Sequence, residues 1–588
     1  MFPVPRRREL LGGAASTDLV QTTVDPSLPL QGYELLVRTE GASIRHRDAL
    51  GLRYATQTLE RLAAEPDVAA QRIVDHPDIA QRGYMLDVSR DRVPTNETLA
   101  WLVKVLAALR YTHLELYMEH TFAYSAHRQV WCDASPLTPE DIAWLDALCA
   151  DNGIELVANQ NTFGHMERWL RHDAYRGRAE CPDGATSPFT GRPMAPSTLA
   201  PTPDNAEFAL TLVRELTGHF ASHVVNIGAD EPFELGQGAS AARVAEHGRA
   251  AVYLEHLDRL IRPLAAEGNH VLFWGDVLRR HPDLVARLPD AGSTAVVWNY
   301  EAPSPDGGLL AGLGPDLLDT LGLPDDAHRG FVAHVRSFVD TGYPFWVAPG
   351  TSTWNSLLGR WTNARDNVLD AATVGRSAGA GGFLLTDWGD NGHLQPLAVS
   401  LLPLAYGAGV AWCADTNAGH DPAPVVDALT GMAGLGALQA ELGDAHLLSG
   451  VSSINGSALF AALDPTRPLP LIGRGTPDTV AETVALLDRA LDWLATLGTG
   501  SGQSQPIGVA VDQERAEQIR LGLTAAVRLA RQGAWRLAKR AGAVEVDDGL
   551  LASDLAECRE LQAVAWLATS RVGGLEDSLR HIPKDPSG

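Results

Sequence analysis

The chain has 588 residues, of which 45% are hydrophobic and 20% are charged, and its formal net charge is -25. This length predicts two to four domains with ample buried core, and the composition is that of a globular protein rather than a disordered one. The excess of acids argues against a nucleic-acid partner, because phosphate binding needs a basic face, and it fits an enzyme acting on neutral substrates.

The cysteines and the N-terminus bear on the cellular compartment. The 5 cysteines are scattered without metal-ligand spacing, which predicts free thiols in a reducing compartment. Arg6-Arg7-Arg8 precedes Leu10-Leu11-Gly12-Gly13, but polar residues follow before an apolar region of roughly 7 to 15 residues can form. We therefore expect a cytoplasmic protein without a signal peptide, with a twin-arginine export signal as the alternative. We find no run of about 18 apolar residues and expect no membrane span.

Three domains are expected along the chain. Residues 1–76 predict a small α/β domain, in which Tyr33 to Thr39 and Ser43 to Arg47 are strands and Ala49 to Ala64 is a helix. Residues 77–415 carry a repeated pattern of strands and helices, described next. Residues 416–588 are predicted to form a C-terminal helical domain.

In the central domain a short apolar strand, a loop and an amphipathic helix of roughly 10 to 20 residues alternate. Helix starts are marked, as at Thr138-Pro139-Glu140-Asp141, where a capping hydroxyl precedes proline. Eight such parallel strands specify an α/β fold of the (β/α)8 TIM barrel type, whose active site lies on the loops after the strands. An open doubly wound sheet is the alternative, but no glycine-rich phosphate loop follows the first strand. The expected strands are Gly83 to Ser89, His113 to Met118, Ile154 to Gln160, His223 to Gly228, His270 to Asp276, Thr294 to Tyr300, Pro344 to Gly350 and Gly382 to Asp390.

Two adjacent carboxylates, Asp230 and Glu231, directly follow the fourth of these strands. At the carboxyl end of a buried strand they would lie where α/β barrels assemble their chemistry. At about 5.5 Å and an effective dielectric of ~20 they would repel by roughly 3 kcal/mol, which predicts that one keeps its proton near neutral pH. A proton donor beside an anion is typical of glycosidases. The alternative for Asp-Glu-Pro after a strand is a helix N-cap.

Tryptophans and polar groups collect at the ends of the other strands. Sugars suit this combination, because their C–H faces stack on aromatic rings and their hydroxyls need planar hydrogen-bonding groups. One tryptophan is more often a core residue, and His165 alone would more often be structural, but four indoles at equivalent strand ends favour a sugar site. No cluster of His, Cys and acids has ligand spacing, so we expect no metal and no cofactor. The candidate residues are Arg90, Glu119, His165, Trp274, Asp276, Trp298, Tyr300, Trp354, Asn355, Trp388 and Asp390.

Several motifs, in their order and spacing, resemble glycoside hydrolase family 20, the β-N-acetylhexosaminidases. The resemblance covers roughly residues 20 to 413, including an N-terminal α/β domain like that of the family. The C-terminal helices resemble the helical extension of some shorter bacterial members. The motifs are Arg82-Gly83-Tyr84-Met85-Leu86-Asp87-Val88-Ser89-Arg90, Gly164-His165, Gly228-Ala229-Asp230-Glu231, Phe273-Trp274-Gly275-Asp276 and Asp387-Trp388-Gly389-Asp390.

The resemblance implies substrate-assisted retention, an exception to the usual nucleophile and acid pair. Glu231 would be the general acid, and Asp230 would orient the substrate's 2-acetamido group, whose oxygen attacks the anomeric carbon. Arg90 matches the arginine that grips the 3- and 4-hydroxyls, and Asp390 matches the acid that receives the 4- and 6-hydroxyls. His165 would support the acid pair without contacting the sugar. The pocket walls would be Trp274, Trp298 and Trp388.

The chain departs from the family pattern in two places. Family members commonly carry a His-x-x-x-Asp-Gln segment after the second strand, where Glu119 is the candidate to take the acid's place. The usual Tyr-x-Asp after the seventh strand, whose hydroxyl binds the acetamido oxygen, is replaced by Thr351-Ser352-Thr353-Trp354-Asn355. Tyr300 and Asn355 are both candidates to replace that tyrosine.

The sequence therefore favours an exo-acting retaining β-N-acetylhexosaminidase that removes terminal β-linked GlcNAc or GalNAc from a small glycan. One alternative keeps the fold but takes a larger or modified N-acetylhexosamine glycan, such as a phosphorylated or sulfated one. Another is a catalytically silent sugar-binding barrel, against which the intact acid pair argues. We expect no nucleic-acid or membrane partner, and a homodimer is left open.

Overall fold

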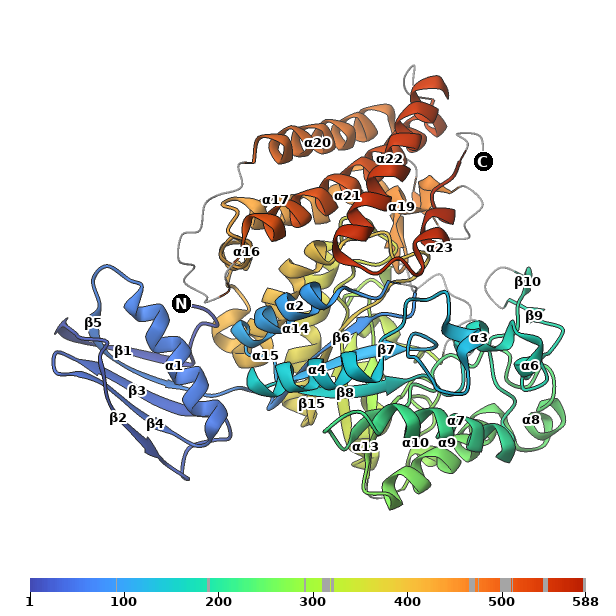
Figure 1. Cartoon of the computed structure of the whole chain (residues 1–588), viewed down its shortest axis with the longest axis horizontal. Helices are drawn as coiled ribbons and strands as arrows, with labels where there is room; N and C mark the ends of the chain where they lie inside the picture. The colour runs from blue at the N-terminus through green and yellow to red at the C-terminus, as the bar shows by residue number, and fades with distance from the viewer. Residues whose placement is uncertain are drawn as a thin grey trace.

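The computed structural model describes residues 1–584 except 91, 188–190, 290–291, 309–317, 319–321, 465–470, 474, 498–508, 510 and 543–547. It consists of a small N-terminal sheet with one helix, a central barrel, and a group of C-terminal helices. In Figure 1 the N-terminal sheet lies to the left of the barrel, and the C-terminal helices lie above it.

Eight parallel strands form a closed barrel in the order β11-β12-β13-β14-β15-β6-β7-β8. Strand β7 is buried along its whole length, as expected where helices cover the outside and side chains fill the inside. The predicted TIM barrel is thus confirmed, with every strand close to its expected position. The strands are β6 (Gln81–Asp87), β7 (His113–Met118), β8 (Glu155–Gln160), β11 (Val224–Asn226), β12 (His270–Trp274), β13 (Ser293–Trp298), β14 (Phe345–Ala348) and β15 (Gly382–Asp387).

The helices around the barrel begin where the sequence offers caps. At the start of α4, Thr138 accepts a hydrogen bond from the Asp141 backbone N–H, the Asp141 side chain accepts one from the Thr138 N–H, and Pro139 is the first helical residue. The longer helices are α2 (Asn96–Ala108), α4 (Pro139–Asp151), α7 (Pro203–Thr217), α9 (Arg249–Ala266), α14 (Trp361–Ala378) and α15 (Leu401–Asn417). The loops carry α3 (Arg128–Trp131), α5 (Glu167–Leu170), α6 (Asp173–Arg176), the pair β9 (Ala185–Thr186) and β10 (Pro193–Met194), α8 (Ala241–His247), α10 (Pro282–Val285), η2 (Ala327–Arg329), α12 (Phe331–His334), α13 (Arg336–Thr341) and η3 (Leu397–Ser400).

The N-terminal domain has more strands than the sequence predicted. It is a five-stranded sheet in the order β1-β5-β3-β4-β2, packed on one helix, whereas only β3, β4 and the helix were expected. Strands β1 and β2 form the two edges and are exposed at every position, so they lack the alternation that marks a half-buried strand. The elements are β1 (Arg7–Ala14), β2 (Leu19–Val24), β3 (Tyr33–Arg38), β4 (Gly41–His46), α1 (Ala49–Ala63) and β5 (Ala69–Asp75).

A buried polar cluster joins this domain to the barrel. Trp412, on α15, donates its Nε1–H to Asp75 at 2.9 Å, and the Arg110 guanidinium lies 4.4 Å from the Trp412 ring. Arg110 also pairs with Asp75 at 3.3 Å, so both buried charges have partners. Arg110 lies shortly before β7 begins at His113, at the end of the barrel opposite the loops that follow the strands. The N-terminal domain therefore lies away from the end where a barrel builds its active site.

The C-terminal region is largely helical, as predicted, but also contains a small sheet in the order β17-β16-β18. The turn between β16 and β17 lies against the loop after β14, where the Ser457 N–H donates to the Asn355 carbonyl at 2.8 Å. The elements are α16 (Ala423–Thr430), α17 (Leu435–Gly443), α18 (Ala445–Leu448), β16 (Val451–Ser453), β17 (Gly456–Ser457), α19 (Ala458–Leu463), β18 (Leu471–Gly473), α20 (Pro477–Thr496), α21 (Gln513–Arg540), α22 (Asp548–Thr569) and α23 (Leu575–Arg580).

One helical segment differs from the expectation that the chain has no apolar run of membrane-spanning length. Among the described residues, Leu397–Asn417 is long and apolar enough to cross a membrane by length and composition, with a mean hydropathy of 1.6. The expectation that no such apolar run exists was therefore wrong. Of its apolar 18-residue window, 94% is buried inside the protein, where α15 packs on the barrel and on the N-terminal domain. A buried core helix passes the same test, so the segment is weak evidence for a membrane.

Candidate active site

A pocket opens at the carboxyl ends of the barrel strands, as the TIM barrel fold predicts. Most of its walls come from loops after strands, and part comes from the turn between β16 and β17 of the C-terminal region. The lining residues are Arg90, His165, Asp230, Glu231, Trp298, Asn299, Tyr300, Glu301, Leu323, Trp354, Trp388, Asp390, Ile454 and Asn455.

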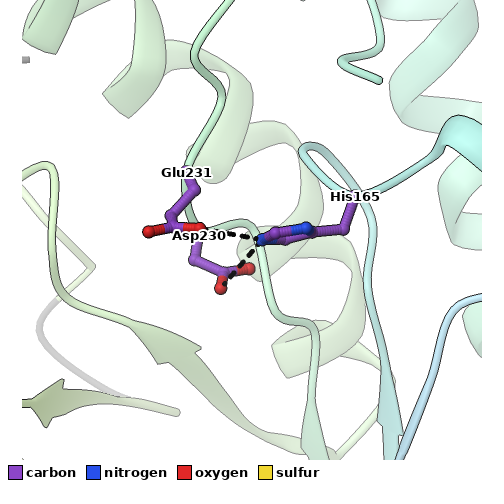
Figure 2. Close-up of side chains that lie close together, drawn as sticks. All are labelled: His165, Asp230 and Glu231. Carbon is purple, nitrogen blue, oxygen red and sulfur yellow. Dashed lines mark ion pairs between the residues drawn. The ribbon is translucent and has the colours of Figure 1, made fainter. Parts of the chain in front are cut away.

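The acid pair lies in this pocket with a histidine between its two members. Figure 2 shows the His165 imidazole reaching from the loop after β8 toward both carboxylates. His165 Nε2 is 3.5 Å from Asp230 Oδ2 and 3.2 Å from Glu231 Oε2. On its other oxygen Asp230 accepts a 2.8 Å hydrogen bond from Asn161 Nδ2. Two groups thus fix the orientation of Asp230, and one of them also contacts Glu231.

The backbone around the acids has unusual conformations. Glu231 has φ 46° and His165 has φ 51°, both in the left-handed region that costs energy for residues other than glycine. Gly164 is required by close approach, since a Cβ there would lie 2.2 Å from the Asp230 carbonyl oxygen. Asp276 Oδ2 accepts a hydrogen bond from the Glu231 N–H at 3.1 Å and so helps to hold this backbone. No helix begins at Asp230, since the next one starts at Ala241, and the N-cap alternative is therefore wrong.

The electrostatics favour an Asp230 anion paired with a protonated His165. Burial by itself would raise the pKa of Asp230, but the His165 charge and hydrogen bonds from His165 and Asn161 outweigh it and hold this pKa below its ordinary value. Burial by itself would lower the pKa of His165, but Asp230 and Glu231 raise it well above its ordinary value. Repulsion between the two acids predicted that one of them keeps its proton near neutral pH, but the imidazole between them, which the sequence did not place, favours an ionised Asp230.

A second charged cluster surrounds Arg90. Arg90 Nη1 lies 3.1 Å from Asp87 and 3.3 Å from Glu119, and Nη2 lies 3.7 Å from Asp390. Burial raises the pKa of Glu119 to about 7, although Arg90 acts against that rise. The Arg90 to Asp390 distance is too long for a direct hydrogen bond, and a ligand hydroxyl that lies beside the pair, about 2.8 Å from each group, can bond to both.

Aromatic rings form the remaining wall. Trp388 Nε1–H donates to the Tyr300 hydroxyl at 2.8 Å, and the Tyr300 ring stacks on Trp298 with centroids 5.2 Å apart. Trp354 meets Tyr300 edge-on at 5.0 Å. The hydrogen bond and ring contacts hold these rings in place, so they offer a rigid apolar surface next to the acids.

The structure separates the predicted site residues into two groups. Nine line the pocket, namely Arg90, His165, Asp230, Glu231, Trp298, Tyr300, Trp354, Trp388 and Asp390. The other four do not line it: Glu119 lies beneath Arg90, Trp274 is fully buried, Asp276 holds the Glu231 backbone, and Asn355 holds the Asn455 backbone carbonyl.

Other pocket residues were not predicted. Asn299 lies between Trp298 and Tyr300 at the end of the sixth predicted strand but was not chosen as a site residue, and Glu301 is the next residue after that strand. Asn161, which holds Asp230, also follows a predicted strand. Ile454 and Asn455 had no signal, because they lie outside the repeated strand and helix pattern.

One group of described residues has the geometry of a metal site. His165, Asp230 and Glu231 each offer a ligand atom within 4.8 Å of the others. The expectation that no such cluster exists was based on spacing in the sequence, and these groups come together from two loops. A metal requires a neutral imidazole, whereas the neighbouring acids raise the pKa of His165. Without a metal, the two acids therefore favour a protonated His165.

Comparisons with known proteins agree with this geometry. The family model for glycosyl hydrolase family 20, catalytic domain, matches residues 80–309, which include Arg90, His165 and the acid pair. The central part of the chain is therefore similar to the catalytic domain of that family. The matched segment includes β6, β7, β8, β11, β12 and β13, and the pocket residues after β14, β15 and β16 lie beyond it.

The chain is also similar to two curated mammalian proteins. It is 26% identical to hexosaminidase D of Homo sapiens over 324 residues, which cover 53% of this chain and 60% of that protein. It is 27% identical to hexosaminidase D of Bos taurus over 192 residues, which cover 31% of this chain and 53% of that protein. The matched residues thus span between half and two thirds of the length of each mammalian protein.

A solved structure extends the likeness in fold over the whole chain. The Flavobacterium johnsoniae chitobiase superposes with a TM-score of 0.54 and 13% sequence identity, covering 99% of this chain and 99% of that one. At this identity the likeness concerns the fold alone.

Proposed function

We propose that this protein is an exo-acting, retaining β-N-acetylhexosaminidase that uses the substrate's own 2-acetamido group as nucleophile. The observation that carries the proposal is the arrangement of Asp230, held by Asn161 and His165, beside the side chain of Glu231 in an aromatic-walled pocket. The match of residues 80–309 to the family 20 catalytic domain and the similarity to hexosaminidase D of two mammals support the same activity.

Each part of the pocket has a role in this mechanism. The Asp230 anion orients the acetamido N–H and stabilises the positive charge that develops as the carbonyl oxygen attacks the anomeric carbon. Glu231 protonates the departing glycosidic oxygen and later takes a proton from the attacking water. Asn161 and His165 position Asp230, and Asp276 positions the Glu231 backbone.

The far end of the sugar would be held by Arg90 and Asp390. These groups lie side by side, 3.7 Å apart, so a hydroxyl in the pocket can accept from the guanidinium and donate to the carboxylate. A sugar whose 3- and 4-hydroxyls are enclosed in this way has no space for a further residue at those positions, which supports exo action.

The aromatic wall would receive the acetamido methyl group. Of the two candidates for the missing family tyrosine, we favour Tyr300, because it lines the pocket and its buried hydroxyl stays protonated as burial raises its pKa well above the ordinary value. The Asn355 side chain is occupied, donating to the Asn455 carbonyl and accepting from Asn391.

The charges of the pocket argue against a phosphorylated or sulfated sugar. Among the described lining residues there are four carboxylates, on Asp230, Glu231, Glu301 and Asp390, against one guanidinium and one imidazole. This wall repels an anionic substituent and accepts hydrogen bonds from neutral hydroxyls. A silent sugar-binding barrel is disfavoured because such a protein gains nothing from strained backbone around two adjacent acids.

The direct test is hydrolysis of p-nitrophenyl β-glycosides with and without the 2-acetamido group. We expect turnover of the GlcNAc or GalNAc glycoside and rates lower by orders of magnitude for the matched glucoside and galactoside. Asp230→Asn should keep the fold and lose most of kcat, because a neutral amide stabilises the oxazolinium charge poorly. A thiazoline mimic of the cyclised intermediate should bind much more tightly than substrate.

Two results would contradict the proposal. Efficient cleavage of plain glucosides, with a covalent adduct on Asp230 trapped by a 2-fluoro sugar, would indicate an ordinary two-carboxylate glycosidase. Binding of N-acetylhexosamine without hydrolysis of any glycoside would indicate the silent barrel.

A further inference from the structure

A second cavity adjoins the active-site pocket beside Glu231. Its volume is about 480 Å³, within the roughly 300 to 1,000 Å³ that is typical of ligand pockets. Glu231 lines both cavities, and the consecutive residues Gly322 and Leu323 line one cavity each. The two cavities therefore meet at the proposed proton donor.

The position of this second cavity indicates which part of a substrate would enter it. If the proposed function is right, Glu231 protonates the oxygen that joins the cleaved sugar to its leaving group. The cleaved sugar occupies the active-site pocket, so the leaving group extends past Glu231 into the adjoining space. Phe233 is half-buried on the wall of this space, and its ring offers a surface on which a second sugar can stack.

The second cavity is more positive than the active-site pocket. Its described lining residues carry three guanidiniums and two imidazoles against three carboxylates, whereas four carboxylates face one guanidinium and one imidazole in the active-site pocket. Burial also raises the pKa of Asp276 to about 7, which reduces its negative charge near neutral pH. The ionisable residues of the second cavity are Arg249, Arg280, Arg287, His247, His281, Glu231, Asp276 and Asp283.

Two of these guanidiniums are held by backbone carbonyls. Arg249 Nη2 donates to the Pro232 carbonyl at 3.0 Å, and Arg280 Nη1 donates to the Leu323 carbonyl at 2.7 Å. A carbonyl orients a guanidinium but leaves its positive charge in place. Arg280 also pairs with Asp325 at 3.1 Å, but the Asp325 side chain is 84% exposed, so water weakens this pair.

The third guanidinium and the start of α9 add to this positive charge. Arg287 is exposed on the cavity wall and forms no ion pair with another residue in the part of the chain that the structure describes. Helix α9 begins at Arg249 without a side-chain cap, and its first three residues line the cavity. The partial positive charge of a helix N-terminus favours an anion, as the guanidiniums do.

We propose that the second cavity is a subsite for an acidic leaving group, a sugar whose carboxylate or phosphate pairs with Arg287 and the neighbouring guanidiniums. This inference rests on the proposed function and adds a substrate class to it. The carboxylates of the active-site pocket repel an anion on the cleaved sugar, but this anion would lie on the other side of Glu231. The expected preference is about three- to tenfold in kcat/KM, between the effect of an exposed ion pair and that of a buried charged hydrogen bond.

The test uses disaccharides that differ only in the charge of the leaving sugar. The N-acetylhexosamine that the p-nitrophenyl assay shows to be preferred is β-linked to glucose, glucuronic acid or glucose 6-phosphate, in both the 1→3 and the 1→4 linkage. We expect the wild type to favour an acidic disaccharide over its glucose counterpart about three- to tenfold at low salt. The preference should shrink as the salt concentration rises, because salt screens exposed charges.

The variant Arg287→Gln removes one positive charge from the cavity wall. It should bring the acidic and the neutral disaccharides to within about twofold of each other in kcat/KM. The matched control is Arg262→Gln, which removes an exposed arginine of α9 that lies outside the cavity, and it should keep the preference.

The outcomes separate this inference from the proposed function. A preference for glucuronic acid indicates a uronic acid as the leaving sugar, a preference for the 6-phosphate indicates a sugar phosphate, and either one supports the subsite. Equal rates on acidic and neutral disaccharides overturn it, and so does a preference that Arg287→Gln leaves undiminished. Hydrolysis of the p-nitrophenyl glycoside but of no disaccharide also overturns it, because the cavity then accepts no second sugar. Wild-type protein that hydrolyses none of these substrates refutes the proposed function as well.

Discussion

Asn161 provides the sharpest test of how the acid pair is organised. Its amide nitrogen donates to Asp230 Oδ1 at 2.8 Å and also lies 3.0 Å from the Tyr117 hydroxyl. The residue is fully buried, so water cannot easily replace a lost hydrogen bond. Asn161 and His165 orient the Asp230 carboxylate together, and Asn161→Ala would leave only His165 of these two.

The size of the effect follows from the type of hydrogen bond removed. A hydrogen bond to a charged group contributes about 1.5 to 3 kcal/mol. Because Asp230 acts on charge that develops in the transition state, the loss should appear in kcat, as a reduction of about 10- to 150-fold. The pKa of Asp230 should also rise when this donor is lost, which moves the acidic limb of the pH–kcat/KM profile to higher pH.

The assay is a pH series of kcat and KM on p-nitrophenyl β-GlcNAc, together with the melting temperature. The matched control is Asn159→Ala, two residues earlier on β8, which is equally buried and donates to Glu115 at 2.7 Å outside the pocket. Asn159→Ala should lower the melting temperature comparably and leave kcat within about threefold, since it removes no contact to Asp230.

The reasoning would be refuted by equal losses of kcat in the two variants, because the effect of Asn161 would then be one of folding. It would also be refuted if Asn161→Ala kept wild-type kcat with an unmoved acidic limb. Asp230 would then be positioned without this amide.

Three further predictions concern other parts of the site. Glu231→Gln should lose far more activity on substrates with poor leaving groups than on activated aryl glycosides, and equal losses in a comparison of the two would exclude it as general acid. Arg90→Ala should weaken catalysis by roughly 2 to 4 kcal/mol through loss of its hydroxyl contacts, and unchanged kcat/KM would make it structural. Activity should survive exhaustive chelation with EDTA, since protonated His165 is a poor ligand; activity lost and then restored by a divalent ion would place a metal at His165, Asp230 and Glu231.

The sequence determined the barrel and much of its active-site end. Buried parallel strands read as apolar runs, and helices begin at recognisable caps such as Thr138, so local patterns were enough to place all eight strands. A barrel then brings the carboxyl ends of its strands to one rim. For this reason the sequence alone assigns Arg90, Asp230 and Trp388 to one pocket.

Local patterns failed where exposure or long-range packing decides the structure. Strands β1 and β2 are exposed on both faces and therefore carry no periodic signal. Similarly, Glu119 and Asp276 follow barrel strands as the sequence indicated, but side-chain packing turns their carboxylates toward Arg90 and the Glu231 backbone.

Only the tertiary structure placed His165 between the two acids and Asn455 in the pocket wall. The first contact requires a glycine at 164 close to the Asp230 carbonyl, and the second requires a C-terminal turn to hydrogen-bond with Asn355 and Glu301. Both depend on segments distant in the chain meeting in one geometry. Such long-range contacts follow from the packing of whole helices, strands and loops. The periodicity of a short stretch of sequence contains no information about them.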